Sequence, residues 1–395
     1  MSEAPADARP LTVFMIAGEE SGDQLADGLM GELERRLGGR VSFVGVGGER
    51  MGRHGLQSLF PISEIGLHGI VPIIRNVGNI MRRMRSTAAT IAEMNPDVLV
   101  IVDVPGFNLG VARRVRKMNP RVPIVQYVSP TVWVWRPGRA RWMRPFVDRI
   151  MGILPFEPEV HRRLGGPPCT YVGHPLIERF DVLRPAPGER PSIAEVEKPV
   201  LLVLPGSRGS EVSRLTDVFG ETVAEVAKMR GPFDVILPAV PRFLDEITRR
   251  AANWPVKPRI VTGEAEKLAA FRRAHAALAA SGTVTLELAL SGVPMVVAYK
   301  VDVLAKLFKK LVLSRIHSIV LPNLVLGANA IPEFIDQDAS APNLAHALLP
   351  LLADTPERRA QVEAFGRLDA LMSPGAKAPS AMAADIVLEA AGRKA

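Results

Sequence analysis

The stretch AHAALAASGTVTLELALSGVPMVV, residues 274–297, contains the pattern that decides the fold. Its apolar run 276–280 predicts a buried strand of a parallel sheet, and a helix-length apolar segment follows the Ser-Gly-Thr turn at 281–283. A glycine and a proline end that helix, and residues 295–299 predict the next strand. The stretch therefore predicts one buried unit of an α/β protein.

The Ser-Gly-Thr turn is a candidate phosphate site. In a parallel sheet it lies at the carboxyl end of a strand and the amino end of a helix, where backbone N–H groups and the helix dipole favour a diphosphate. We therefore predict that Ser281, Gly282 and Thr283 bind phosphate, with Gly282 allowing a close approach. Glu287 follows one helical turn later, where its carboxylate can accept hydrogen bonds from two ribose hydroxyls. The alternative is that the turn only caps the helix.

The second half of the chain begins with the same pattern. The strand 200–204 is followed by the loop PGSRGSE and a helix whose expected N-cap is Ser210. Arg208 would project from a loop rich in backbone N–H groups, a setting suited to phosphate oxygens. We place Ser207 and Glu211 in the same substrate-binding site. Two phosphate-suited loops in one half are stronger evidence for a nucleotide site than either loop alone.

The first half opens as a Rossmann-type unit. Strands are predicted at 11–17 and 41–46, with a glycine-bearing turn and a helix between them. The turn lacks the G-x-G-x-x-G pattern, so no dinucleotide cofactor is expected. Its residues Glu19, Ser21 and Gly22 are candidate substrate-binding residues.

Asp103 stands at the carboxyl end of the next predicted strand, residues 97–102, and is followed by VPGFN. Open α/β sheets bind ligands at that end of their strands, so Asp103 is a candidate catalytic carboxylate. The alternative is that it only forms the turn beside Pro105 and Gly106.

A further strand, residues 124–128, leads into the loop SPTVWVWR. Tryptophan rings can stack on a sugar ring, and an arginine can bind a phosphate. The candidate substrate-binding residues here are Tyr127, Ser129, Trp135 and Arg136. At least one of the two tryptophans could instead pack under the loop.

Length and composition narrow the class of protein. The 395 residues suit two α/β domains, and the single cysteine excludes an internal disulfide framework, as expected in a reducing compartment. The amino-terminal residues do not resemble a signal peptide, and no apolar run is long enough to span a bilayer. The seven histidines form no metal-ligand pattern. We therefore expect a soluble or peripheral cytoplasmic protein without a metal.

The formal net charge of +8 predicts a polyanionic partner, either nucleic acid, an anionic membrane surface or a phosphorylated substrate. Basic clusters at 75–85, 136–149 and 306–315 alternate with bulky apolar residues. This texture is typical of attachment to a membrane surface rather than of a nucleic-acid-binding arm. Within the apolar segment 67–84, which overlaps the first cluster, Pro72 and Gly78 are expected to weaken any long helix. The Pro-rich, charged segment 179–198 is the expected linker between domains.

The motifs taken together resemble those of the lipid-A-disaccharide synthase family, in order along most of the chain. The matching stretches are AGEESGD (17–23), GVGGERM (45–51), PDVLVIVDVPGFN (96–108), YVSPTVWVWR (127–136), LPFEPEV (154–160), VGHPL (172–176), LPGSRGSEV (204–212), ASGTVTLELALSGVPMVVAYK (280–300) and LPNLVLGANAIPE (321–333).

This resemblance implies a GT-B fold of class α/β, with two Rossmann-like domains facing each other across a cleft. The acceptor-binding domain would comprise residues 1–178 and returning helices from about 355–395, and the UDP-sugar-binding domain residues 199–350. The implied reaction joins UDP-2,3-diacylglucosamine to 2,3-diacylglucosamine 1-phosphate, with inversion, to give a β-1,6-linked disaccharide and UDP. The implied location is the cytoplasmic face of the inner membrane, with an anionic membrane surface but no nucleic acid as partner, and a homodimer is one expected assembly.

The resemblance also implies roles for single residues. Asp103 matches the family's essential aspartate, Arg208 its essential arginine and Asn323 the asparagine of its LPN motif. Glu287 matches the ribose-binding glutamate of related GT-B transferases. No cofactor is implied.

The chain departs from the family pattern at two positions. Gly106 stands where the family often has a second aspartate, and we expect Asp103 to suffice without it. Pro72 stands where the family commonly has a glutamate, which affects the expected membrane and acceptor contact.

Two other functions compete with this interpretation. One is another GT-B enzyme acting on a UDP-sugar, either a transferase with a different acceptor or a UDP-sugar 2-epimerase. The other is a non-catalytic, basic protein that binds a membrane surface or nucleic acid, which would explain the charge but not the two phosphate-suited loops or the paired tryptophans.

Overall fold

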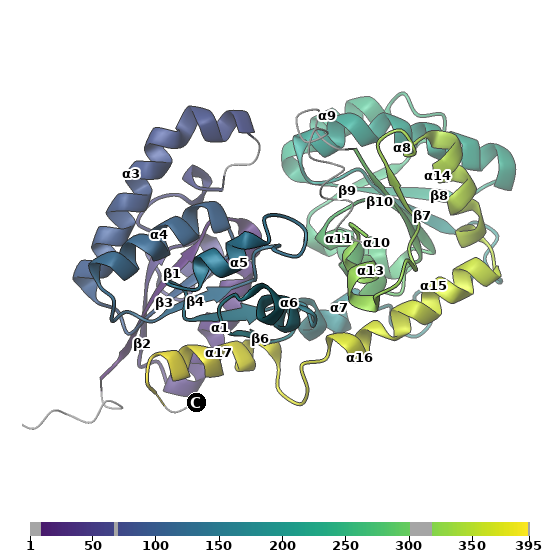
Figure 1. Cartoon of the computed structure of the whole chain (residues 1–395). Coiled ribbons are helices and arrows are strands. Elements are labelled where there is room, and N and C mark those ends of the chain that lie inside the picture. The colour runs from purple at the N-terminus through teal and green to yellow at the C-terminus, as the bar shows by residue number, and fades with distance from the viewer. Residues whose placement is uncertain (1–8, 67–69, 301–317, 394–395) are drawn as a thin grey trace, which may run out of the picture. The chain divides into compact units, whose positions relative to one another are not determined.

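A computed structural model describes residues 9–66, 70–300 and 318–393, and the chain folds as two units. The first unit comprises Met1–Pro175 with Pro374–Ala395, and the second comprises Leu176–Ser373. Each unit contains its own parallel sheet with helices on both faces (Figure 1).

The sheet of the first unit has the order β2-β1-β3-β4-β5-β6, and each described pair of neighbours is parallel. Its strands are β1 (Leu11–Ala17), β2 (Val41–Val46), β3 (Val98–Val102), β4 (Ile124–Tyr127), β5 (Arg149–Gly152) and β6 (Cys169–Tyr171). The chain builds β2 on one side of β1 and then β3 on the other. The carboxyl ends of β1 and β3 therefore form the topological switch point, the place where open α/β sheets bind ligands.

The helices of the first unit cover both faces of this sheet. They are α1 (Glu20–Leu37), α2 (Glu49–Gly52), α3 (Ile70–Met94), α4 (Pro105–Met118), α5 (Gly138–Met143), α6 (Glu157–Leu164) and α17 (Pro379–Ala390). Side chains alternate along a strand, so Val13 and Met15 share a core with α1 and α17, whereas Phe14 and Ile16 share a core with α3 and α4. This burial on both faces explains why β1 is an unbroken apolar run.

The sheet of the second unit has the order β12-β11-β10-β7-β8-β9 and is also parallel. Its strands are β7 (Val200–Leu204), β8 (Asp234–Ala239), β9 (Arg259–Thr262), β10 (Ala276–Ala280), β11 (Met295–Tyr299) and β12 (Glu333–Ile335). Here the order reverses between β7 and β10. The loops after these two strands therefore share the switch point of the second sheet.

The helices of the second unit also lie on two faces (Figure 1). They are α7 (Phe180–Leu183), α8 (Gly209–Arg230), α9 (Leu244–Ala251), α10 (Glu264–Arg273), α11 (Thr283–Leu290), α13 (Leu321–Leu326), α14 (Ala341–Leu348), α15 (Pro356–Gly366) and α16 (Leu368–Met372). Helices α8 and α14 lie side by side, and their Phe219 and Leu344 share a core with Leu201 and Val203 of β7.

The strand predictions agree closely with the structure. Strands β1, β2, β7, β10 and β11 have the predicted bounds. The other predicted strands differ by one or two residues at their ends: 97–102, 124–128, 149–154, 170–172, 233–237 and 258–261. The short strand β12 was not predicted, because its three residues are only half-buried and form no long apolar run. It pairs with β11 at the edge of the second sheet.

Pro72 and Gly78 were expected to weaken any long helix, but α3 contains both and runs for 25 residues, Ile70–Met94. Pro72 lies in its first turn, where a backbone N–H has no partner within the helix, and an internal glycine costs only about 1 kcal/mol. No helix among the described residues is long and apolar enough to cross a membrane. The basic cluster at 306–315 lies outside the described residues.

The unit boundary on the amino-terminal side differs from the expected linker. Residues 179–198 belong to the second unit, where the Arg190 guanidinium donates to the carbonyl oxygens of Arg272 at 3.1 Å and Gly292 at 2.9 Å. These bonds attach the Pro-rich segment to the second unit.

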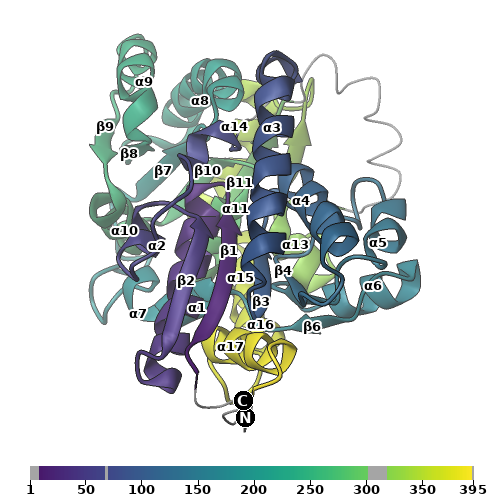
Figure 2. The same ribbon diagram turned by 90° about the vertical axis from the view of Figure 1, so that its left-hand side faces the viewer.

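The return of the chain to the first unit also differs from the expected residue of about 355. Helix α15 still belongs to the second unit, because Arg358 donates to the carbonyl oxygen of His275 at 2.6 Å. The return begins at Pro374, and α17 then lies beside α1 (Figures 1 and 2). An ion pair of 2.5 Å between Arg36 and Asp385 joins the two helices.

Candidate active site

Asp103 lies directly after β3, at the switch point of the first sheet, and is half-buried. Its backbone φ is 49° and that of Val104 is 38°, both in the left-handed region that a β-branched valine rarely adopts. The turn is in contact with the loop after β1, because a Cβ on Gly18 would lie 2.9 Å from Cγ2 of Val104. Two of the three loops predicted to carry site residues in the first half therefore meet, those after β1 and β3.

The loop after β1 presents some of its predicted site residues and buries another. Glu19 is the N-cap of α1 and Ser21 is exposed. Gly22 is buried, and a Cβ there would be in ordinary contact, 3.5 Å, with Ala17 and Val102. Gly22 therefore contributes to packing between α1 and the sheet, whatever its part in binding.

Asp23 is a residue of the AGEESGD stretch whose role the sequence did not reveal. Its buried carboxylate accepts hydrogen bonds from the backbone N–H of Gly48 at 2.7 Å, Arg50 at 2.9 Å and Met51 at 3.2 Å. A side chain at Gly48 would collide with this carboxylate. Asp23 thus attaches the start of α2 to α1 and holds the loop after β2 beside the switch point.

The loop after β4 begins in the core. Tyr127 is 1% exposed, and Ser129 is 2% exposed with its Oγ 2.7 Å from Nε2 of His161. Burial lowers the pKa of His161 to about 4, so the imidazole is neutral at pH 7. A Cβ on Gly166 would lie 2.4 Å from Nδ1 of this ring. Helix α6 therefore fixes the first residues of the loop.

The two tryptophans of this loop have different environments. Trp133 packs edge-to-face against Phe156, with ring centroids 5.2 Å apart, so one tryptophan does pack under the loop as considered. Trp135 is 37% exposed, and the Arg136 guanidinium lies 5.4 Å from its ring centroid. Only Trp135 and Arg136 are presented for stacking or phosphate contact.

Glu157 is a buried carboxyl group that sequence reasoning did not single out, although it lies in the LPFEPEV stretch. It is 0% exposed, and burial raises its pKa to about 8. Oε2 accepts a hydrogen bond from the backbone N–H of Leu154 at 3.0 Å, and Oε1 has no partner among the described residues. At pH 7 the group is therefore protonated and stabilises the turn after β5 as a neutral acid.

The loop after β7 is organised by Glu211. Its Oε2 accepts hydrogen bonds from the backbone N–H of Ser207 at 3.0 Å and Arg208 at 3.3 Å. Its Oε1 pairs with the Arg208 guanidinium at 3.1 Å. The N-cap of α8 is Arg208, which corrects the expected Ser210, because the chain already enters the helix at Gly209. Arg208 is exposed and remains available to an anion.

The loop after β10 leaves open space at Gly282. Among the described residues, no heavy atom beyond the two chain neighbours lies within 4 Å of the position that a Cβ would occupy there, and the backbone φ of 164° is ordinary extended chain. Thr283 begins α11 and is exposed, whereas the Ser281 hydroxyl donates to the carbonyl oxygen of Ile319 at 3.0 Å. The first-turn N–H groups of α11 therefore open onto this space.

Glu287 and Asn323 already have structural partners. Oε2 of Glu287 pairs with Nζ of Lys267 at 2.7 Å, and this ion pair orients the carboxylate. Asn323 is 0% exposed, and its amide donates to and accepts from the backbone of Ile331, each at 2.9 Å. These bonds account for the Asn323 amide structurally, and its part in ligand binding stays a prediction.

The loops after β7 and β10 are neighbours because the two strands pair directly. Arg208 and the first turn of α11 therefore share the switch point of the second sheet, as Asp103 and the Glu19 loop share that of the first. Among the described residues, no group of three or more His, Cys, Asp or Glu side chains is placed to hold a metal ion.

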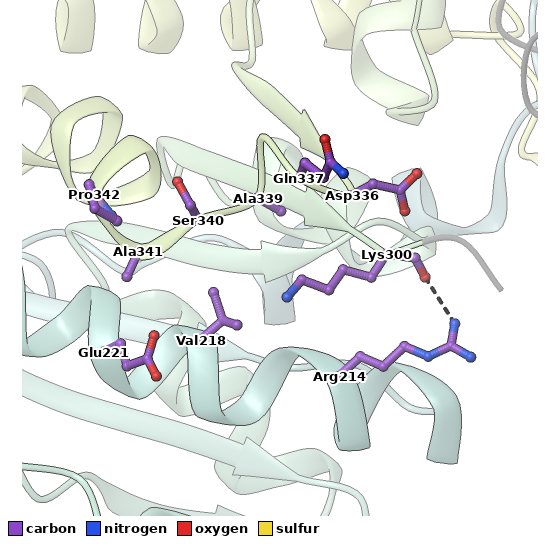
Figure 3. Close-up of a pocket in the computed structure, with 10 residues that line it drawn as sticks. All are labelled: Arg214, Val218, Glu221, Lys300, Asp336, Gln337, Ala339, Ser340, Ala341 and Pro342. Carbon is purple, nitrogen blue, oxygen red and sulfur yellow. Dashed lines mark hydrogen bonds between the residues drawn. The ribbon is translucent and has the colours of Figure 1, made fainter. Parts of the chain in front are cut away.

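A pocket of about 510 Å³ in the second unit contains none of the predicted site residues (Figure 3). It lies between α8 and the start of α14, and the Lys300 side chain extends into it above Val218. The Arg214 guanidinium donates to the carbonyl oxygen of Lys300 at 3.3 Å. With Glu221 on its wall, this pocket is of mixed charge and is less suited to a diphosphate than the two loops.

Comparison with known proteins identifies both the family and the fold. The family model "Lipid-A-disaccharide synthetase" matches residues 13–387. A protein of Bradyrhizobium diazoefficiens named lipid-A-disaccharide synthase is 53% identical over 376 residues, 95% of each chain. The solved UDP co-structure of S. aureus MnaA aligns with a TM-score of 0.64 at 10% identity, covering 98% of this chain and 99% of that one. The kitacinnamycin glycotransferase aligns with a TM-score of 0.61 at 18% identity, covering 97% and 99%.

Proposed function

Because the chain belongs to the lipid-A-disaccharide synthetase family, whose members are hexosyltransferases of lipid A biosynthesis, we propose that it condenses two diacylated glucosamines. The donor is UDP-2,3-diacylglucosamine, the acceptor is 2,3-diacylglucosamine 1-phosphate, and the products are the β-1,6-linked disaccharide 1-phosphate and UDP. The observation that carries the proposal is the position of Asp103 and of the Arg208 and Ser-Gly-Thr loops at the switch points of two Rossmann-like sheets.

The transfer is a single displacement with inversion. The acceptor's 6-hydroxyl oxygen forms a bond to the donor's anomeric carbon while the bond from that carbon to the diphosphate breaks. The hydroxyl proton passes to the Asp103 carboxylate, and the bonding electron pair leaves with UDP. A positioned general base of this kind contributes about 100-fold or more to the rate.

The second unit stabilises the departing nucleotide. The Arg208 guanidinium and the first-turn N–H groups of α11 supply positive charge to the diphosphate. Lys267 holds the Glu287 carboxylate ready to accept hydrogen bonds from the ribose hydroxyls. In the first unit, Trp135 and Arg136 bind the acceptor sugar and its phosphate, beside Glu19 and Ser21.

The test of this proposal is substitution of the base. Asp103→Asn keeps the shape of the side chain but cannot take a proton, so turnover should fall about 100-fold or more while UDP binding stays within about twofold. The measurement is UDP release with both acylated sugars, together with calorimetric UDP binding. Undiminished turnover would remove Asp103 from the role of base.

Two controls belong with this test. Gly106→Asp introduces the second carboxylate that the family often has. The described residues leave room for it, because outside its own stretch of helix none of their atoms lies within 4 Å of a Cβ there. We expect its turnover to stay within about threefold of the parent. Asp338→Asn changes an exposed acid of the second unit and should leave turnover unaltered.

A second candidate function, suggested by the fold alone, is UDP-sugar 2-epimerisation, since proteins of that activity share the fold at 10% identity. The two activities differ in their products. A disaccharide formed only when the acceptor is present supports the transferase, whereas a changed UDP-sugar without acceptor supports the epimerase.

We further propose that the protein works peripherally on the cytoplasmic face of the inner membrane and contacts it through an arginine–tryptophan patch. The patch consists of Arg113, Arg136, Arg139, Arg141, Arg144, Trp135 and Trp142. None of these five arginines pairs with a described carboxylate, and residues 129–147 contain no acid. Arg83 of the 75–85 cluster, by contrast, pairs with Glu64 at 2.8 Å.

The physical reason for this choice is charge and amphipathic character. Unpaired arginines near anionic lipid contribute about 1 kcal/mol each, and tryptophan prefers the membrane interface. Trp142 is 44% exposed. Co-sedimentation with phosphatidylglycerol vesicles should fall for Arg141→Glu with Arg144→Glu. It should be retained for Arg249→Glu with Arg273→Glu, exposed arginines of the second unit, and equal loss in both would contradict the patch.

A further inference from the structure

Two buried side-chain amides lie under the turns that follow β3 and β4 in the first unit. Asn108 is on α4 and Gln126 on β4, and both are 0% exposed. In each case the amide nitrogen donates to carbonyl oxygens of a turn with left-handed backbone, and the amide oxygen has no partner among the described residues. Asn108 is the last residue of the VPGFN motif, and the sequence pattern does not reveal its role.

Asn108 holds the turn that carries Asp103. Its Nδ2 donates to the carbonyl oxygen of Val102 at 2.9 Å and to that of Asp103 at 2.8 Å, and it lies 3.5 Å from the carbonyl oxygen of Ile16. Its backbone N–H also donates to the carbonyl oxygen of Val104 at 3.1 Å. One residue therefore bonds to both sides of the strained pair Asp103–Val104.

Gln126 does the same for the next turn. Its Nε2 donates to the carbonyl oxygens of Tyr127 and Val128, each at 3.0 Å, and Val128 has a φ of 69°. The two turns are linked, because the backbone N–H of Asp103 donates to that same carbonyl oxygen of Tyr127 at 3.0 Å.

The orientation of both amides is decided by these acceptors. A flipped amide would place its oxygen against carbonyl oxygens, which repel it, so the nitrogen must face the turn. The oxygens are then left buried without a partner, which is unfavourable. A core position that keeps a half-satisfied amide, where leucine has a similar shape, indicates that the N–H donors are needed.

We propose that Asn108 is a positioning residue whose amide holds the Asp103–Val104 turn in its strained conformation and so presents the Asp103 carboxylate for proton transfer, with Gln126 supporting the neighbouring turn. The proposal rests on the proposed role of Asp103 as base. Strained backbone persists only where its surroundings determine it, and misplacement of a reacting group by about 1 Å can cost about 100-fold in rate.

The first experiment replaces the amide by an apolar group of similar shape. Asn108→Leu loses the N–H donors and the unpartnered oxygen together, so its melting temperature should stay within about 5 °C of the parent. Its kcat for UDP release should nevertheless fall about 100-fold, with both KM values within about threefold. If Asn108 had only a packing role, activity would change only as far as stability changes. A kcat within about threefold of the parent would therefore overturn the proposal.

The second experiment relieves the backbone strain at Val104 instead of restoring the hydrogen bonds of the Asn108 amide. Asparagine adopts left-handed backbone more readily than valine, so Val104→Asn added to Asn108→Leu should regain about tenfold in kcat. Val104→Thr keeps the branched shape and should regain nothing. Equal recovery in both, or in neither, contradicts the proposal.

A third measurement separates this inference from the proposed function. If Asp103→Asn retains turnover, Asp103 is not the base. Whether the Asn108 amide holds the Asp103–Val104 turn can still be tested by measuring stability. Asn108→Ala should then lower the melting temperature by about 4 °C more in the Val104 protein than in Val104→Asn. Equal shifts in the two backgrounds would show that Asn108 is not coupled to the backbone strain at Val104. That result would overturn the proposal that its amide holds the turn. Because alanine leaves a cavity in both backgrounds, the comparison cancels its cost.

Discussion

At the residue scale, buried polar groups shape the carboxyl edge of the first sheet. Glu157, His161 and Ser129 are all buried there, and none belongs to an ion pair among the described residues. Desolvation therefore decides their protonation, raising the pKa of the acid and lowering that of the imidazole. These three groups are consequently neutral at pH 7.

Glu157 makes stability depend on pH in a predictable direction. Its pKa is 4.5 in the unfolded chain and about 8 in the native state, so between these values the native state binds more protons. Stability should therefore fall as pH rises, by about 1.4 kcal/mol per pH unit from this group. Glu157→Gln removes the titrating group. Urea unfolding at pH 5.5, 7 and 8.5 should show that the free energy of unfolding of the variant rises relative to that of the parent as pH rises. A constant difference across that range would contradict the assignment.

At the element scale, the start of a helix after a strand is used twice in the second unit, and differently each time. At α8, the Glu211 carboxylate already accepts the loop's N–H groups, so the exposed Arg208 guanidinium is the group available to a ligand. At α11, no described side chain caps the helix and no described residue fills the space beside Gly282. The two loops therefore differ in what they offer a diphosphate, a guanidinium in one and a helix amino terminus in the other.

Gly282 allows binding and folding to be separated by one substitution. Within the part of the chain that the structure describes, a valine there has no non-neighbouring atom within 4 Å of its Cβ, and it needs no unusual φ. Gly282→Val should therefore keep its melting temperature within about 3 °C. Its branched side chain would occupy the phosphate position, so UDP affinity should fall about 100-fold by calorimetry. Unaltered UDP affinity would show that the first turn of α11 does not bind the nucleotide.

At the scale of the whole molecule, each unit is a Rossmann-like sheet whose switch point carries one part of the proposed chemistry. The first unit supplies a carboxylate and a tryptophan–arginine loop, and the second supplies groups suited to a diphosphate. The chain also crosses back, because α17 completes the first unit after the second unit has been built. Ala384 and Val387 of α17 belong to the core that Val13 and Met15 line, so the first unit is incomplete without the end of the chain.

The different roles proposed for the two units predict which backbone amides UDP protects from hydrogen exchange. At a concentration of about 100 times its Kd, UDP should stabilise its binding loops by about 2.7 kcal/mol. Amide hydrogen exchange should then slow by about 100-fold in residues 205–212 and 281–288, and stay unaltered in residues 103–108. Protection confined to 103–108 would reverse the proposed roles of the two units.

Much of the fold could be predicted because both sheets are parallel and buried on both faces. Such strands are continuous apolar runs, and glycine-bearing loops mark their ends, so β1, β7 and β10 were found with their bounds. The same pattern placed Asp103, Arg208 and Ser281 at strand ends. Where burial is partial the pattern weakens, so β12 was missed and the return of the chain was placed near residue 355 instead of Pro374.

The sequence by itself determined the class of fold, the family and the loops that carry candidate chemistry, because apolar periodicity and short motifs are local properties of the chain. Only the tertiary structure decided which of those residues already bond to other residues of the protein. These pairs are Asn323 with Ile331, Glu287 with Lys267, and Ser129 with His161. It also revealed Asn108 and Gln126 beneath the left-handed turns. The reason is physical: a hydrogen bond or a desolvated carboxyl depends on groups that are distant in sequence and are brought together only by folding.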